Sequence, residues 1–326
     1  MSTPFAVIDI GTNAVKCAIY NNGRITVLNN KFLNNSQGYD DLNKDEVLTH
    51  VQAFINETKT TYGVDKEKTH ICATEGLRTS KNQQEICDTI YQATGRPVLI
   101  LYKQTEARLS FYGAMLRIPQ ENRPKEKNIL YIESGGGSTE MTLFSMDKRP
   151  PKIVATVSVP FGSKRFDMSK KDNVFESAVH EFTEQINNKN FHINVSSLSC
   201  LINSTTAARI IASTLPQKPV FFNNEVTMEK QRYTSAIKFH QQLDDILNNK
   251  TDFNYWLKND KDVEGFKNHC RIFKEFFYRL SKKNFPINKI WRLSTSYGGV
   301  KEGYLAEQLS PQEISEITFK KNYTPR

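Results

Sequence analysis

The apolar and polar positions of the chain predict strands first and then alternating helices and strands. Three short apolar runs open the sequence, and the turn Asn21-Asn22-Gly23 after the second run is typical of a β-hairpin. Further along, apolar residues recur at helical spacing and indicate amphipathic helices. The predicted elements of this first part are strands at 5–10, 15–20, 24–28, 69–73 and 97–101, and helices at 45–61, 83–94 and 106–116.

The same order of elements starts again after a polar, Pro-containing stretch at 122–127, which suits a linker. The predicted elements of this second part are strands at 129–132, 139–144, 152–159, 198–202 and 290–293, and helices at 175–188, 206–213, 226–247, 263–280, 302–309 and 311–317. A duplicated unit of three turn-linked strands and then helices and strands predicts an α/β fold of two lobes, 1–120 and 121–326. In an alternative arrangement, the last helix packs back on the first lobe.

Composition and charge narrow the class of protein. A length of 326 residues suits two domains. No signal peptide is apparent, and no apolar run approaches the roughly 20 residues that span a bilayer. The five cysteines have no close spacing, which favours free thiols in a reducing, cytoplasmic setting. A formal net charge of +9 fits either a solvated basic surface or attraction to a polyanion, and no nucleic-acid-binding motif appears.

Two turns of similar chemistry occupy equivalent places in the two repeats. One runs from Asp9 to Asn13 and the other from Glu133 to Glu140, and each places a carboxylate before small residues and then hydroxyl or amide side chains. Successive backbone N–H groups in such turns bind anions, and a carboxylate beside a phosphate needs a cation between them. The pair predicts a phosphate site in which Asp9 and Glu133, facing each other across two lobes, hold Mg²⁺ or another divalent cation. Each turn taken alone also fits a plain tight hairpin.

Six segments in order then resemble the exopolyphosphatase / guanosine pentaphosphate phosphohydrolase (Ppx/GppA) family of the actin-like ATPase superfamily. The strongest single matches are Gly-Gly-Gly-Ser-Thr-Glu, ending at Glu140, and Thr-Glu-Ala-Arg-Leu, which contains Glu106. The other matching segments are Asp9–Lys16, Ala73–Asn82, Ser158–Gly162 and Leu293–Gly303. The resemblance implies two ribonuclease-H-like lobes with the site in an interlobe cleft, in a short form without extra C-terminal domains.

The resemblance also implies roles for particular residues in the hydrolysis of a terminal phosphate. Glu106 would be the general base, and Glu140 would orient the attacking water or help to hold the metal. Arg78 would neutralise the terminal phosphate. The residues expected to contact phosphate are Gly11, Thr12, Asn13, Lys16, Arg78, Gly135, Gly136, Gly137, Ser138 and Thr139. Without the resemblance, Glu106 reads as a first-turn helix residue, Glu140 as a strand residue and Arg78 as a surface charge.

The chain departs from the family pattern at several of these positions. Glu133 stands where the family has Asp, Lys16 where it has Arg, and Thr105 where it has a first Glu. Tyr102-Lys103 replaces Ser-Gly, Ser134 replaces an apolar residue, and Ser204-Thr205-Thr206 lacks a glycine expected in a third loop. One added methylene at Glu133 can shift a metal, because working sites are held within about 0.5 Å.

These departures keep several functions open. The leading hypothesis is exopolyphosphatase activity, and the close alternative is removal of the 5′ γ-phosphate of guanosine pentaphosphate. A kinase would use Gly298-Gly299 as a nucleotide loop, and a weakly catalytic sensor would bind polyphosphate or guanosine tetra- or pentaphosphate. The expected partners are these phosphorylated molecules and a second copy of the chain in a homodimer, with neither membrane nor nucleic acid.

Overall fold

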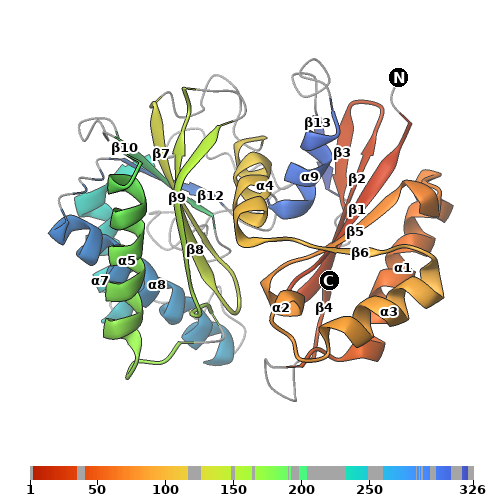
Figure 1. Cartoon of the computed structure of the whole chain (residues 1–326), viewed down its shortest axis with the longest axis horizontal. Helices are drawn as coiled ribbons and strands as arrows, with labels where there is room; N and C mark the ends of the chain where they lie inside the picture. Colours follow the sequence, from red (N-terminus) through yellow and green to blue (C-terminus); the bar gives the residue numbers. More distant parts are fainter. Residues whose placement is uncertain are drawn as a thin grey trace. The chain divides into compact units, whose positions relative to one another are not determined.

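The computed structural model divides the chain into two compact units. One unit consists of Met1–Arg117 and Tyr297–Arg326, and the other of Ile118–Ser296 (Figure 1). The structure describes residues 3–34, 41–116, 126–147, 151–163, 166–189, 191, 198–203, 233–248, 260–283, 285, 287, 289–293, 299–309 and 318–321. The predicted lobes, 1–120 and 121–326, differ from these units in residues 118–120 and in the segment 297–326.

A mixed sheet forms the centre of the first unit. Its described strands run in the order β13-β3-β2-β1-β5-β6, and β4 also pairs with β2. The strands are β1 (Phe5–Ile10), β2 (Ala14–Asn21), β3 (Arg24–Val27), β4 (Lys31–Phe32), β5 (Thr69–Ala73), β6 (Val98–Ile100) and β13 (Thr318–Lys321). The first three are antiparallel, whereas β5 runs parallel to β1 and β13 parallel to β3.

Helices cover both faces of this sheet (Figure 1). They are α1 (Lys44–Tyr62), α2 (Glu75–Arg78), α3 (Gln83–Thr94), α4 (Lys103–Leu116) and α9 (Val300–Glu307), with a short 3₁₀ turn at Lys66–Lys68. Successive residues of β1 point to opposite faces, so Ile8 joins the core under α1 and α3 while Val7 joins the core under α4 and α9. Both faces are buried, which explains why β1 is apolar at almost every position.

The second unit has its own sheet, in the order β11-β12-β10-β7-β8-β9. Its strands are β7 (Asn128–Ser134), β8 (Thr139–Ser145), β9 (Lys152–Val159), β10 (Leu198–Asn203), β11 (Tyr233–Ser235) and β12 (Lys289–Leu293). The helices α5 (Lys171–Asn187), α7 (Ala236–Leu247) and α8 (Asp260–Lys282) bury their apolar sides in one core with β7, β8 and β10. Phe175 packs edge-on against Phe276 within that core.

The structure corrects some element boundaries. The helix predicted at 226–247 begins only at Ala236, because 233–235 forms β11 and pairs with β12. The helix predicted at 106–116 begins at Lys103. The short elements β4, α2 and β13 were not predicted. The predicted helices at 206–213 and 311–317, residues 122–125 of the linker and the third loop at 204–206 lie outside the described residues.

The remaining structural expectations concern cysteines and membrane spans. All five cysteines are free, as the sequence predicted, and four of them are buried. Within the described ranges, the helices are too short or too polar to cross a lipid bilayer.

Candidate active site

The first predicted phosphate loop connects β1 to β2 through a tight hairpin. The Gly11 N–H donates to the Ala14 carbonyl at 3.1 Å. Asp9 and Lys16 are cross-strand partners, and the Lys16 ammonium lies 3.6 Å from Asp9 Oδ2. The other oxygen, Asp9 Oδ1, is buried and has no hydrogen-bond partner within the described structure, and the same holds for Asn13 Oδ1. The loop therefore keeps two buried acceptor atoms available for a further ligand.

The short helix α2 packs directly on this loop. The Thr74 N–H, just before α2, donates to the Ile10 carbonyl at 3.1 Å. A methyl group added at Gly76 would lie 2.6 to 2.8 Å from the Cα, N and Oγ1 atoms of Thr12, which is closer than side chains approach backbone. Only glycine fits at position 76, so the loop and α2 are held together by backbone contact.

Arg78 and Glu106 form an ion pair next to this contact. Arg78 Nη1 lies 2.6 Å from Glu106 Oε2 and also donates to the Leu101 carbonyl at 2.6 Å. The two side chains are only 15% and 10% exposed. Arg78 Nη2 is buried without a hydrogen-bond partner among the residues that the structure describes. Arg78 thus positions Glu106 with one nitrogen and has a second nitrogen left for an anion.

Cys72 shows how closely the charges gather here. It is the neighbour of Asp9 on the parallel strand β5. Burial raises the pKa of the Cys72 thiol well above its ordinary value, and the negative charges of Asp9 and Glu106 raise it further, while Lys16 and Lys301 act in the opposite direction. Asp9, Lys16, Glu106 and Lys301 are therefore all close enough to act on one thiol.

The second predicted phosphate loop connects β7 to β8. The Gly135 N–H donates to the Ser138 carbonyl at 3.0 Å, and Ser134 and Thr139 join their hydroxyls at 2.6 Å below the turn. Thr139 also donates to the Phe161 carbonyl at 2.8 Å. Ser134 breaks the apolar pattern of the strand, but its hydroxyl has a hydrogen-bond partner in Thr139. This bond joins the two strands where the loop begins and ends.

Glu140 lies opposite Glu133 in the antiparallel pair of β7 and β8, and Glu140 is the more buried of the two. Ser158 of β9 donates its hydroxyl proton to Glu140 Oε1 at 3.0 Å. This bond fixes one oxygen of the carboxylate. Sequence reasoning did not single out Ser158 as a partner, although its place in the Ser158–Gly162 segment marked the region.

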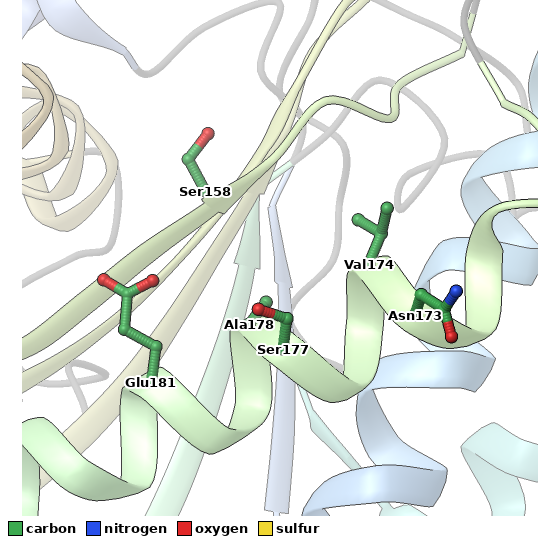
Figure 2. A pocket seen from close by; sticks show the side chains of 6 residues that line it. All are labelled: Ser158, Asn173, Val174, Ser177, Ala178 and Glu181. Carbon is green, nitrogen blue, oxygen red and sulfur yellow. The ribbon is translucent and has the colours of Figure 1, made fainter.

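Ser158 also borders a cavity of about 330 Å³ between β9 and α5. Figure 2 shows Glu181 extending from α5 toward β9, whereas the Ser158 hydroxyl points away from α5. The other lining residues are Asn173, Val174, Ser177 and Ala178. Glu181 is the charged member of this lining, and its negative charge disfavours a phosphate at this position.

Glycine acts in the second loop through close packing. A methyl group added at Gly162 would lie 2.5 Å from Gly136 C, 2.6 Å from Gly136 O and 2.7 Å from Gly135 O. The positive-φ glycines of the described structure lie elsewhere, so neither phosphate loop uses the left-handed conformation that glycine permits. Gly162 has the same function here as Gly76 in the first unit: a glycine later in the chain packs against the backbone of a predicted phosphate loop.

We expect Gly162→Ala to displace the second loop and to reduce the predicted release of phosphate by about 100-fold, because misplacement by about 1 Å has effects of that size. Backbone atoms cannot yield as a flexible side chain does. Gly299→Ala is the matched control, since an added methyl there would have its nearest neighbour at 3.9 Å. Phosphate release and the thermal midpoint of each variant would be measured. Equal activity of the two variants would contradict the supporting role of Gly162.

The predicted site residues thus form two groups. Asp9, Gly11, Thr12, Asn13, Lys16, Arg78 and Glu106 lie together in the first unit, and Glu133, Gly135, Gly136, Gly137, Ser138, Thr139 and Glu140 lie together in the second. The sharing of one cation by Asp9 and Glu133, which belong to different units, stays a prediction, as does the interlobe cleft. Within the described ranges, no three His, Cys, Asp or Glu side chains form a metal cluster.

This donor set still fits a magnesium ion. Mg²⁺ is usually held by one or two carboxylates together with waters and substrate phosphates, not by a protein cage. The buried, unpartnered Asp9 Oδ1 provides such a carboxylate oxygen, and the Lys16 ammonium occupies only the neighbouring Oδ2.

Comparison with known proteins decides the family. The model of the Ppx/GppA phosphatase family matches residues 12–311, which is most of the chain. The chain belongs to the Ppx/GppA phosphatase family. The predicted fold class, an α/β fold of two ribonuclease-H-like lobes of the actin-like ATPase type, is confirmed together with it.

Individual members of the Ppx/GppA family and similar proteins are distant in sequence. A putative exopolyphosphatase of Haemophilus influenzae is 28% identical over 145 residues, covering 42% of this chain and 43% of its own. Retrograde regulation protein 2 of Saccharomyces cerevisiae is 29% identical over 103 residues, covering 31% and 16%. The chain therefore spans less than half the length of these curated relatives.

Solved structures agree over nearly the whole chain. An exopolyphosphatase from Cytophaga hutchinsonii has a TM-score of 0.66 at 17% identity and covers 97% of this chain and 99% of its own. The Aquifex aeolicus Ppx/GppA phosphatase, in its type II variant, has a TM-score of 0.59 at 17% identity and covers 95% and 100%. At 17% identity these structures establish the fold of this chain. They do not establish its substrate.

Proposed function

We propose that the chain hydrolyses the terminal phosphate of inorganic polyphosphate with the help of a divalent cation, in the manner that the name of its family suggests. One observation carries the proposal: buried polar atoms without partners, Asp9 Oδ1, Asn13 Oδ1 and Arg78 Nη2, surround the loop next to the Arg78–Glu106 pair. Unpartnered buried polar atoms are costly in a fold unless a ligand completes them. Atoms of both polarities fit a cation and a phosphate bound together.

In the proposed reaction, the predicted site residues have distinct roles. Glu106 takes a proton from the attacking water, because its carboxylate is held in place by Arg78. Arg78 Nη2 and the Lys16 ammonium neutralise negative charge on the phosphoryl oxygens. The N–H groups and hydroxyls of the second loop hold the adjoining phosphates, and Glu140, oriented by Ser158, directs the water. Asp9 would hold Mg²⁺, which supplies charge neutralisation between the phosphates when bound.

The charge of the chain favours a long polyanion over a single nucleotide. A net charge of +9 attracts a polymer of phosphates through many weak contacts. Such attraction is screened by salt. We therefore expect the KM for long polyphosphate to rise more steeply with ionic strength than the KM for guanosine pentaphosphate.

Phosphate release from three substrates tests the proposal. Long-chain polyphosphate, guanosine pentaphosphate and ATP are compared with and without Mg²⁺. We expect Mg²⁺-dependent turnover that is fastest on polyphosphate, and Asp9→Asn is expected to raise the Mg²⁺ concentration required by at least about tenfold, since it removes a charged metal ligand. Preference for guanosine pentaphosphate would replace the substrate in the proposal, and tight binding of polyphosphate without turnover would replace the enzyme by a sensor.

A further inference from the structure

Two donors, His269 and Ser163, hold the carbonyl of Gly135 in one direction. His269 Nε2 of α8 lies 2.8 Å from this oxygen, and the Ser163 N–H donates to it at 3.0 Å. A carbonyl oxygen can only accept, so Nε2 of His269 carries the proton in this contact. The position of the first carbonyl in the glycine loop is therefore fixed from the side of α8 and Ser163.

These two hydrogen bonds fix the direction of the peptide that follows. The site of a methyl group on Gly162 would be 2.7 Å from Gly135 O, so this oxygen faces Gly162. In a planar trans peptide the N–H points opposite to the preceding C=O. The N–H group of Gly136 consequently points away from Gly162. Backbone N–H groups in such a turn bind anions.

The group that turns the peptide is itself rigid. His269 is 1% exposed, and its ring stacks on Phe273 with a centroid distance of 6.1 Å. The preceding residue, Asn268, donates to the Ser163 carbonyl at 3.2 Å and so holds the second donor to Gly135 from the same helix. Two adjacent residues of α8 thus control both hydrogen bonds to one carbonyl oxygen.

We propose that His269 is a positioning residue that keeps the N–H group of Gly136 directed away from Gly162, as a donor to a phosphate oxygen. It does so without touching the ligand, by holding the Gly135 carbonyl on the opposite side. The ligand class is a phosphate or polyphosphate anion, and its identity as a substrate rests on the proposed function. The apolar neighbours of position 269 would bury an apolar side chain as well as they bury histidine. The contribution specific to His269 is therefore the hydrogen bond from Nε2 to the Gly135 carbonyl.

Anion binding observed at the amides tests this directly. The chain is labelled with ¹⁵N at its 15 glycines and titrated with inorganic phosphate at millimolar concentration. We expect the Gly136 N–H signal of the unmodified chain to shift with phosphate in both the ¹H and the ¹⁵N dimension. His269→Gln keeps a side-chain N–H donor and should preserve these shifts, whereas His269→Met has a similar volume without the donor. His269→Met should lose the shifts and bind phosphate about tenfold more weakly, the effect of one ordinary hydrogen bond.

The outcomes separate the inference from the proposed function. Equal phosphate affinity in His269→Met and His269→Gln would overturn the role of the donor nitrogen. An unmodified chain whose Gly136 N–H signal does not change with phosphate would overturn the inference even where polyphosphate is hydrolysed, and this measurement needs no variant. Phosphate-dependent shifts without any release of phosphate from polyphosphate would overturn the proposed function and support the inference.

Discussion

Glu106→Gln is expected to lower kcat for phosphate release by about 100- to 10,000-fold, with little change in KM. Positioned general bases contribute factors of that size. Glutamine has the size of glutamate, and its amide oxygen can still accept the bond from Arg78 Nη1 that now spans 2.6 Å. The variant therefore removes the proton acceptor and leaves the local packing. Initial rates over a range of polyphosphate concentrations would separate kcat from KM.

A second ion pair on the same helix provides the control. Arg108 of α4 pairs with Glu307 at 2.8 Å, and both side chains are about one third exposed. Glu307→Gln breaks an arginine–carboxylate pair that contains α4 without touching the loop, so activity should stay within about twofold, as partly exposed pairs contribute little. Full activity in Glu106→Gln would show that another group accepts the proton. Equal losses in both variants would show that Glu106 acts by holding α4.

Most of the fold was predictable because its strands and helices carry clear periodic patterns. The three strands of each repeat were placed within a residue or two, since buried strands such as β1 are apolar on both faces. The elements that were missed are short or depend on distant partners. β13 is recognised only by its pairing with β3, almost 300 positions earlier, and β11 only by its pairing with β12. Local propensity contains no such information.

In the candidate site, too, residues with a local sequence pattern could be predicted and residues that depend on distant partners could not. The two loops could be predicted because glycine and hydroxyl residues directly follow a carboxylate at the end of a strand. The residues that hold those loops could not. Gly76 and Gly162 lie in segments that resemble the family, but their contacts with Thr12 and Gly136, 64 and 26 positions away, leave no local pattern. His269 has an ordinary sequence context and lies 134 positions from Gly135. The residues that support the loops are determined by tertiary contacts, and a single sequence does not contain these contacts.

The largest effect on stability is expected at a buried ion pair that sequence reasoning also missed. Lys301 and Glu302 of α9 are 2% and 0% exposed, and the ammonium lies 3.1 Å from Glu302 Oε2. Lys301→Met alone would leave a buried carboxylate without its cation, at a cost of about 3–5 kcal/mol. A loss of that size should lower the thermal midpoint of the first unit by roughly 10 °C. Differential scanning calorimetry would record it.

The double variant Lys301→Met with Glu302→Leu distinguishes charge from packing. Replacing both members of a buried pair by apolar residues of similar volume is often neutral, so we expect the double variant to recover most of the lost stability. Because α9 packs against α4, which carries Glu106, and against β1, which carries Asp9, the recovered fold should also recover phosphatase activity. A double variant that is stable but inactive would place the charge of Lys301 or Glu302 in the reaction itself. A single variant as stable as the unmodified chain would show that the Glu302 carboxylate does not depend on Lys301.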